Sequence, residues 1–153
     1  MTESDAPQGG PRDTLRSIEL TQIGEGRYKA TNARGGVLPI GSGDDPDFTP
    51  VELLLAAIAG CSAIDVDLIT GKRARATSFD VHAQGDKVRD EHGNHLRDIT
   101  VTFDVTFPVG DAGDAARGVL QRAIEQSRDR LCTVSRTVAL PTPVEMVRTD
   151  ADR

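Results

Sequence analysis

The sequence predicts an α+β fold with a mainly antiparallel sheet and two main helices. Two observations support this prediction. Short segments of alternating apolar and polar residues are separated by glycine-containing turns, which is typical of antiparallel hairpins. Two longer segments, residues 49–71 and 111–131, have the composition and periodicity of helices. The expected order of strands, helix, two strands, helix and strand lacks the regular strand–helix alternation of a parallel sheet.

Three short strands are predicted ahead of the first helix. Residues 14–22 alternate in polarity, and residues 27–33 and 37–40 follow after turns that contain two glycines each. Residues 41–47 are rich in glycine, aspartate and proline, so a loop is expected there. Together these segments indicate a small antiparallel meander.

The N-terminal end of the chain is expected to lie outside the fold. Residues 1–13 are polar and lack both the basic start and the apolar block of a signal peptide. We expect a flexible tail there and a single domain over residues 14–149. A chain of 153 residues, 37% of them apolar, can bury one core of ordinary size.

The first helix has the clearest start in the sequence. Thr49 can cap it, Pro50 suits the first helical position, and Glu52 completes a Thr-x-x-Glu capping box. From Leu53 to Ile64 nearly every residue is apolar or small. A helix that is apolar on all faces is expected to be buried on all sides, in the centre of a domain or at a dimer interface.

The second half of the chain predicts a long strand pair, a helix and a final strand. Residues 77–88 and 99–107 alternate in polarity over most of their length and form the strongest strand pair. The second helix is expected over residues 111–131, with one apolar stripe. A final strand is expected over residues 133–147, at an edge of the sheet because two prolines interrupt it.

Composition excludes several classes of function. The net charge of −6 disfavours nucleic acid and acidic membranes as partners, because contact with phosphates needs a basic surface. No apolar run reaches the roughly 18 residues of a membrane span, so none is expected. His92 and His95 fall near a turn without further metal-binding residues beside them, so no metal site is predicted. A cytoplasmic location follows by default.

Two cysteines are the strongest candidates for chemistry. Cys61 lies within the first helix and Cys132 at the end of the second. In a chain without an export signal, such a pair favours redox chemistry over a structural disulfide. Asp65, one turn after Cys61 on the same helical face, opposes ionisation of its thiol. Cys132 is expected to gain nothing from the helix dipole, which disfavours an anion at a helix C-terminus.

Two motifs of the chain are notable: the segment from Pro50 to Cys61, Pro-Val-Glu-Leu-Leu-Leu-Ala-Ala-Ile-Ala-Gly-Cys, and Cys132-Thr-Val at a helix end. Together they resemble the OsmC/Ohr family of cytoplasmic hydroperoxide-reducing proteins. The resemblance covers roughly residues 14–147. It implies an intertwined homodimer with each active site near the subunit interface, and it implies no metal, haem or flavin. Cys61 would attack the peroxide oxygen, become a sulfenic acid and condense with Cys132 to a disulfide. A dithiol reductant, of lipoyl type in the better-known branch, would restore the thiols.

The sequence departs from the peroxidase branch in its activating residues. That branch carries a glutamate directly after the helix-starting proline, paired to an arginine that activates the cysteine, and here Val51 occupies the position. Glu52 is the nearest carboxylate and is assigned a supporting role, as is Asp65. Arg34 is our first candidate for the activating arginine, ahead of Arg27. The sequence around Cys61 resembles a less-characterised branch of the family.

Three functions remain open at this point. The leading one is a thiol-dependent peroxidase for organic hydroperoxides that acts in the oxidative stress response. The second is a dimeric binding or stress-associated domain on the same fold, without peroxidase activity, which the valine at position 51 favours. The third is a thiol-based redox sensor.

Overall fold

The computed structural model describes residues 14–149 and has an α+β fold. All paired strands in this part of the chain are antiparallel, as predicted. The chain divides into two compact units, Met1–Pro50 and Val51–Arg153. The expected tail, residues 1–13, lies outside the described residues. That both units belong to one domain stays a prediction.

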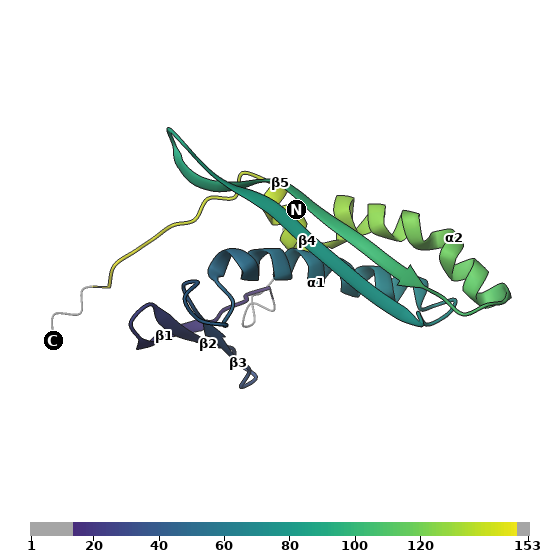
Figure 1. Cartoon of the computed structure of the whole chain (residues 1–153), viewed down its shortest axis with the longest axis horizontal. Coiled ribbons are helices and arrows are strands. Elements are labelled where there is room, and N and C mark those ends of the chain that lie inside the picture. The colour runs from purple at the N-terminus through teal and green to yellow at the C-terminus, as the bar shows by residue number, and fades with distance from the viewer. Residues whose placement is uncertain (1–13, 150–153) are drawn as a thin grey trace, which may run out of the picture. The chain divides into compact units, whose positions relative to one another are not determined.

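The N-terminal unit is a three-stranded meander. It consists of β1 (Glu19–Gly24), β2 (Arg27–Thr31) and β3 (Val37–Ile40), paired in that order (Figure 1). Gly26, at the β1–β2 turn, has a φ of 64°, a conformation that glycine adopts at low cost. The predicted strands are present, although the first two are shorter than expected. Every residue of β1 is exposed.

The helix α1 (Pro50–Thr70) has 21 residues, and all of them after Pro50 belong to the second unit. It starts at the proline that the sequence indicates, and the amide of Gly71 closes it on the carbonyl of Asp67 at 2.8 Å. The four buried residues of α1 recur at every fourth position: Ile58, Ser62, Val66 and Thr70.

A single chain does not bury α1 on all sides, so its burial at a dimer interface stays a prediction. Ile64 is 63% exposed and Leu68 is 65% exposed. One chain covers only one stripe of the helix, so the remaining apolar surface is left to solvent or to another molecule. By length and composition alone α1 could cross a membrane, a test that core helices of soluble proteins also pass.

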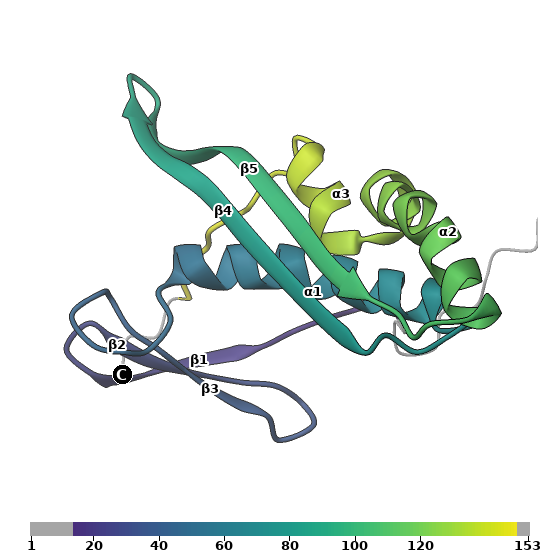
Figure 2. The same ribbon diagram turned by 45° about the vertical axis from the view of Figure 1, so that its right-hand side comes forward.

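A long hairpin of β4 (Ser78–Asp90) and β5 (Gly93–Thr106) forms the second sheet. Its half-buried face pairs Phe79 with Val105 and Val81 with Phe103. The rings of Phe79 and Phe103 meet edge to face with centroids 6.2 Å apart. In both ribbon views the hairpin crosses α1 and its turn projects beyond the helices (Figures 1 and 2).

The C-terminal part is helical where a strand was expected. After α2 (Asp111–Gln126) come a π-helical turn, η1 (Ser127–Leu131), and a short helix, α3 (Thr133–Ala139). Residues 140–149 form no regular element, so the predicted strand over residues 133–147 is wrong. The β-branched residues of α3 favour a strand locally, but helical backbone bonds prevail, including one from the Arg136 amide to the Cys132 carbonyl at 2.9 Å.

Candidate functional site

The fold brings the two cysteines close together, so that each affects the pKa of the other. Cys61 lies on α1 and is partly buried, whereas Cys132, between η1 and α3, is 0% exposed. Both are free thiols. The two candidates that stood out in the sequence are thus neighbours in space, held by different elements of the same unit.

The π-helical turn places Cys132 beside α1. The amide of Cys132 donates to the carbonyl of Ser127 at 2.9 Å, across a turn one residue wider than that of an α-helix. The buried Ser127 hydroxyl donates in turn to Asp65 Oδ2 at 2.9 Å. This bond fastens η1 to α1 one helical turn beyond Cys61. Asp65 is therefore a structural anchor as well as a nearby charge.

Cys132 occupies the N-cap position of α3. Its Sγ accepts a hydrogen bond from the backbone amide of Ser135 at 3.3 Å. Burial disfavours its thiolate, but hydrogen bonds from Ser135, Cys61 and Ser62 outweigh burial and lower the pKa of Cys132 below its usual value. Cys132 ends a helical segment, η1, as expected, and the same residue also begins the next helix.

Cys61 has the opposite environment. Burial is the largest influence and raises the pKa of Cys61 above its usual value. The backbone amide of Val134 lowers that pKa, while Cys132 and the charge of Asp65 raise it further.

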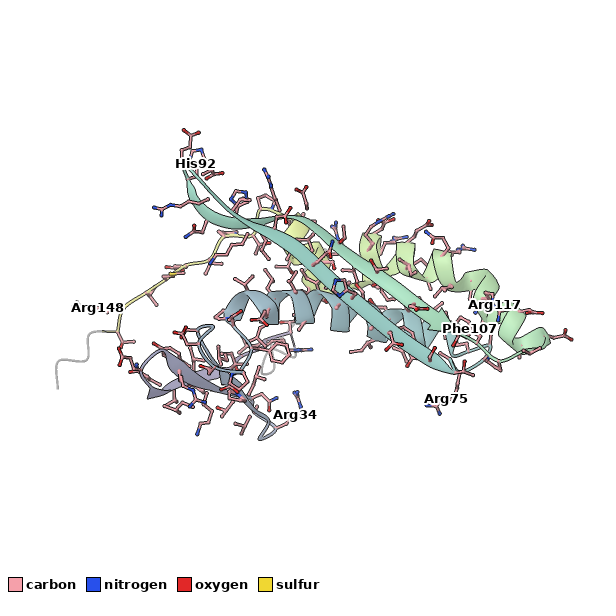
Figure 3. All side chains as sticks on the ribbon, in the orientation of Figure 1. Arg34, Arg75, His92, Phe107, Arg117 and Arg148 are labelled. Atoms are coloured by element: carbon pink, nitrogen blue, oxygen red, sulfur yellow. The ribbon has the colours of Figure 1, made fainter. Side chains whose placement is uncertain are left out.

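The two candidate arginines lie in the N-terminal unit and differ in their bonding. Arg34 is exposed in the turn between β2 and β3, where its backbone amide donates to Asn32 Oδ1 at 3.0 Å (Figure 3). Arg27 binds Asp47 at 2.8 Å and Asp45 at 3.8 Å. The hydrogen bond to Asp47 and the two carboxylate charges raise the pKa of Arg27. Arg27 is thus engaged in holding the loop that precedes α1.

Glu52 lies in the first turn of α1 and is exposed. This position is the one that the capping box predicts, and a carboxylate there is favoured by the helix dipole. Within residues 14–149, no group of three or more His, Cys, Asp or Glu side chains could hold a metal ion.

A cavity of about 300 Å³ is lined by Ser62, the residue after Cys61, and by Ser135, whose amide binds Cys132. It is bounded by residues of α1, β5, α2, η1 and α3, and most of its lining is apolar. Its polar lining consists of Ser62, Arg128 and Ser135. The guanidinium of Arg128 is itself bound to Asp129 by two hydrogen bonds, of 2.7 and 3.1 Å. The cavity thus offers an apolar space flanked by the serines that neighbour the two sulfurs.

Sequence reasoning missed the three serines of this site: Ser62, Ser127 and Ser135. Ser62 could have been found, because it follows Cys61 directly on the helix. Ser135 was hidden by the strand expected over residues 133–147, which gives no reason for its amide to reach Cys132. Ser127 was hidden because an uninterrupted α-helix was expected where the π-helical turn occurs.

Comparison with known proteins gives consistent results. A family model described as OsmC-like protein matches residues 41–147. An uncharacterised protein of Mycobacterium tuberculosis is 32% identical over 134 residues, which cover 86% of this chain and 95% of that protein.

Two solved structures share the fold. An OsmC-like protein of unknown function from Vibrio cholerae has a TM-score of 0.68 at 14% identity, covering 81% of this chain and 93% of that one. The organic hydroperoxide resistance protein OhrB of Bacillus subtilis has a TM-score of 0.50 at 16% identity, covering 79% of this chain and 90% of that one.

Proposed function

The chain belongs to the family of OsmC-like proteins, and on that premise we propose that it is a thiol-dependent peroxidase that reduces organic hydroperoxides. The observation that carries the proposal is the closeness of two free thiols, Cys61 and Cys132, which come from separate elements. The fold shared with a hydroperoxide resistance protein supports a stress-related, peroxidase-like role.

The proposed cycle uses the two thiols in turn. Cys61 is the more accessible sulfur, so it attacks the outer peroxide oxygen, the O–O bond breaks, and an alcohol leaves. The resulting sulfenic acid on Cys61 is attacked by the sulfur of Cys132, which forms a disulfide and releases water. Two electrons from a dithiol, of lipoyl type by family resemblance, return both cysteines to thiols.

The substrate class follows from the surroundings of the thiols. The apolar cavity beside Ser62 and Ser135 suits a hydrocarbon group better than it suits hydrogen peroxide. We therefore propose organic hydroperoxides as substrates, with the peroxide oxygens near Cys61 and the organic group in the cavity.

Arg34 remains our candidate for the activating cation. Within residues 14–149 its guanidinium makes no ion pair, whereas that of Arg27 is bound by two carboxylates. A guanidinium at the site would stabilise the peroxide oxygens as charge develops on them. Glu52 and Asp65 are assigned supporting roles, as a helix-start carboxylate and as the anchor of η1.

We propose that the active protein is a homodimer in the cytoplasm. The OsmC-like fold suggests a soluble protein. The exposed β1 strand and the exposed apolar residues of α1, Ile64 and Leu68, leave surface that a second copy would cover. We propose that both units take part in this dimer.

Substitution of each cysteine tests the function. Cys61→Ser should abolish consumption of cumene hydroperoxide, because the attacking sulfur is gone. Cys132→Ser should stop after at most one oxidation per site, because no disulfide can form. Consumption is measured with a dithiol reductant in excess, and Thr100→Ser on the exposed side of β5 serves as a control. Equal and mild effects of both cysteine substitutions would contradict the proposal.

A second candidate function is a dimeric binding or stress-associated domain without peroxidase activity. It is favoured by the raised pKa of Cys61, which follows from burial and from the nearby Cys132 and Asp65. It predicts that the apolar cavity binds a ligand while peroxide is not consumed by the wild-type protein. The cysteine experiment therefore separates the two candidates.

A further inference from the structure

Two neighbouring cavities in the second unit share part of their lining. The cavity of about 300 Å³ beside Ser62 and Ser135 is also bounded by Ile99 and Val138. A second cavity, of about 290 Å³, is lined by the same two aliphatic side chains. Its other lining residues come from the start of α1 and from the half of the hairpin near its turn: Val51, Leu54, Lys87, Asn94, His95 and Leu96. Ile99 and Val138 therefore form a partition between two spaces, of which the first is lined by the serine next to Cys61.

A bulge in β5 extends the cavity side of the sheet from the first cavity to the second. Ala83 pairs with Val101 and Lys87 pairs with Leu96, so β5 uses one residue more than β4 between these pairs. Without the extra residue, Leu96 would lie on the face opposite to Val101, because successive side chains of a strand alternate between faces. Asp98, within the bulge, has a φ of 53°, which few residues other than glycine adopt. Bulges of this kind redirect side chains next to functional sites.

The two side chains of the partition are held differently. The place where a Cβ of Gly85 would stand is 3.1 Å from Cγ1 of Ile99, so the isoleucine occupies space that a side chain on β4 would take. Ile99 is half-buried, and its branched Cβ restricts its rotation. Val138 belongs to the short helix α3 and is 46% exposed. Val138 can therefore be made smaller without loss of core packing, while Ile99 stays in place.

We propose that Ile99 and Val138 determine substrate specificity by confining the organic group of the hydroperoxide to the first cavity. This inference rests on the proposed peroxidase function and deepens it. A compact group, such as that of cumene hydroperoxide, fits the first cavity. An unbranched chain of similar carbon number is longer and has to pass the partition to reach the second cavity. Ligand pockets measure roughly 300–1,000 Å³, so each cavity alone is at the lower limit of this range.

The selection acts on shape rather than on charge. Both cavities are bounded by aliphatic side chains where they meet. Among the described residues that line the first cavity, Arg128 is the charged one, and its guanidinium is bound to Asp129 at 2.7 Å. An added or missing methylene in an apolar pocket changes kcat/KM by roughly 10–200-fold. The loss of the two methyl groups of Val138 should therefore have a measurable effect.

Val138→Ala tests the partition in the full-length protein. The kcat/KM is measured for cumene hydroperoxide and for n-octyl hydroperoxide, with a dithiol reductant in excess. We expect wild type to favour cumene hydroperoxide and Val138→Ala to raise kcat/KM for n-octyl hydroperoxide by about 10-fold, with little change for cumene hydroperoxide. Val101→Ala is the control, because Val101 lines the first cavity and not the second. Equal use of both hydroperoxides by wild type, or the same gain in Val101→Ala, would overturn the inference.

A second substitution shows where the longer chain goes. Leu54 lines the second cavity and not the first, and it is 38% exposed on α1. Leu54→Trp fills the second cavity, so adding it to Val138→Ala should remove the gain for n-octyl hydroperoxide. Cumene hydroperoxide should be reduced as before by the double variant. An undiminished gain in the double variant would show that the chain does not enter the second cavity and would overturn the inference.

Binding of the product alcohols separates this inference from the proposed function. Titration calorimetry measures the affinity of the reduced protein for 2-phenyl-2-propanol and for 1-octanol, without any peroxide. Wild type should bind 2-phenyl-2-propanol more tightly, and Val138→Ala should shift the preference towards 1-octanol by about 10-fold. If wild type consumes neither hydroperoxide, the proposed function fails, while the alcohols still test the partition. Absence of 2-phenyl-2-propanol binding to wild type, or an unchanged preference in Val138→Ala, would overturn the inference.

Discussion

The two thiols of this protein lie close together but differ in their neighbours. Cys132 lies among hydrogen-bond donors that come from α1 and from the first turn of α3. Cys61 lies on the same face of α1 as Asp65, whose carboxylate accepts a bond from Ser127. Asp65 therefore has two effects that substitutions can separate: its charge raises the pKa of Cys61, and its hydrogen bond holds η1 against α1.

Asp65→Asn and Asp65→Ala form a matched pair. Asparagine removes the charge but keeps an oxygen that can accept from Ser127, so stability should change little. Because a neighbouring negative charge raises the pKa of a thiol, Asp65→Asn should lower the pKa of Cys61. Asp65→Ala should do the same and also lose about 1 kcal/mol of stability through the broken bond.

The measurement is alkylation of Cys61 against pH, in the Cys132→Ser background, so that a single thiol titrates. Stability is measured in parallel by urea unfolding. A Cys61 titration that does not move to lower pH in either variant would show that the Asp65 charge does not reach the sulfur.

Among the elements, α2 shows how closely a helix start can be packed. Gly113, in its first turn, lies so near the backbone of Pro108 that a side chain there would collide with the proline carbonyl. Gly118, in the middle of the same helix, has nothing within 4 Å of the place where a Cβ would stand. The two glycines therefore have different reasons to be present.

Replacing each glycine by alanine should give effects of opposite sign. Gly118→Ala should raise stability by about 1 kcal/mol, because alanine favours the helix and meets no obstacle. Gly113→Ala should lower stability by about 1–3 kcal/mol, because the Pro108 backbone must move. Thermal and urea unfolding of both variants measures this. Equal shifts in the same direction would contradict the packing at Gly113.

At this scale the sequence predicts elements better than it predicts their junctions. The start of α1 at Pro50 and the whole of β3 follow from local rules of capping and alternation. The helix α3 does not, because its β-branched residues favour a strand and its N-cap is a cysteine. The closeness of Cys132 to Cys61 was suggested by family resemblance, whereas the donors around Cys132 depend on the π-helical turn and could not be predicted.

For the molecule as a whole, apolar side chains are exposed on both units. In the N-terminal unit Leu20 is 53% exposed and Ile23 is 50% exposed, on a sheet of three short strands. In the second unit Ile64 and Leu68 are exposed one turn apart on α1. A soluble protein that leaves such surfaces uncovered gains by association, which is the physical basis for the proposed homodimer.

Ile64→Glu tests the dimer. A charge on the exposed face of α1 should weaken association, because it would have to be desolvated in the interface. We expect sedimentation velocity to show a dimer for wild type and a shift towards monomer for Ile64→Glu. The unfolding midpoint of the wild type should also depend on protein concentration. Ile64→Leu, which stays apolar, is the control. A stable folded monomer of the wild type at micromolar concentration would contradict the proposal.

The capping of α3 by Cys132 has a consequence for how the oxidation state is transmitted through the backbone. The amide of Ser135 is held by the same sulfur that would enter a disulfide. A thiolate accepts that bond strongly, whereas a neutral disulfide sulfur accepts it weakly. Oxidation would thus release the first turn of a helix only seven residues long. The hydrogen-exchange protection of one amide proton, that of Ser135, would then report the redox state of the whole site, and fraying of α3 would expose the buried sulfur to its reductant.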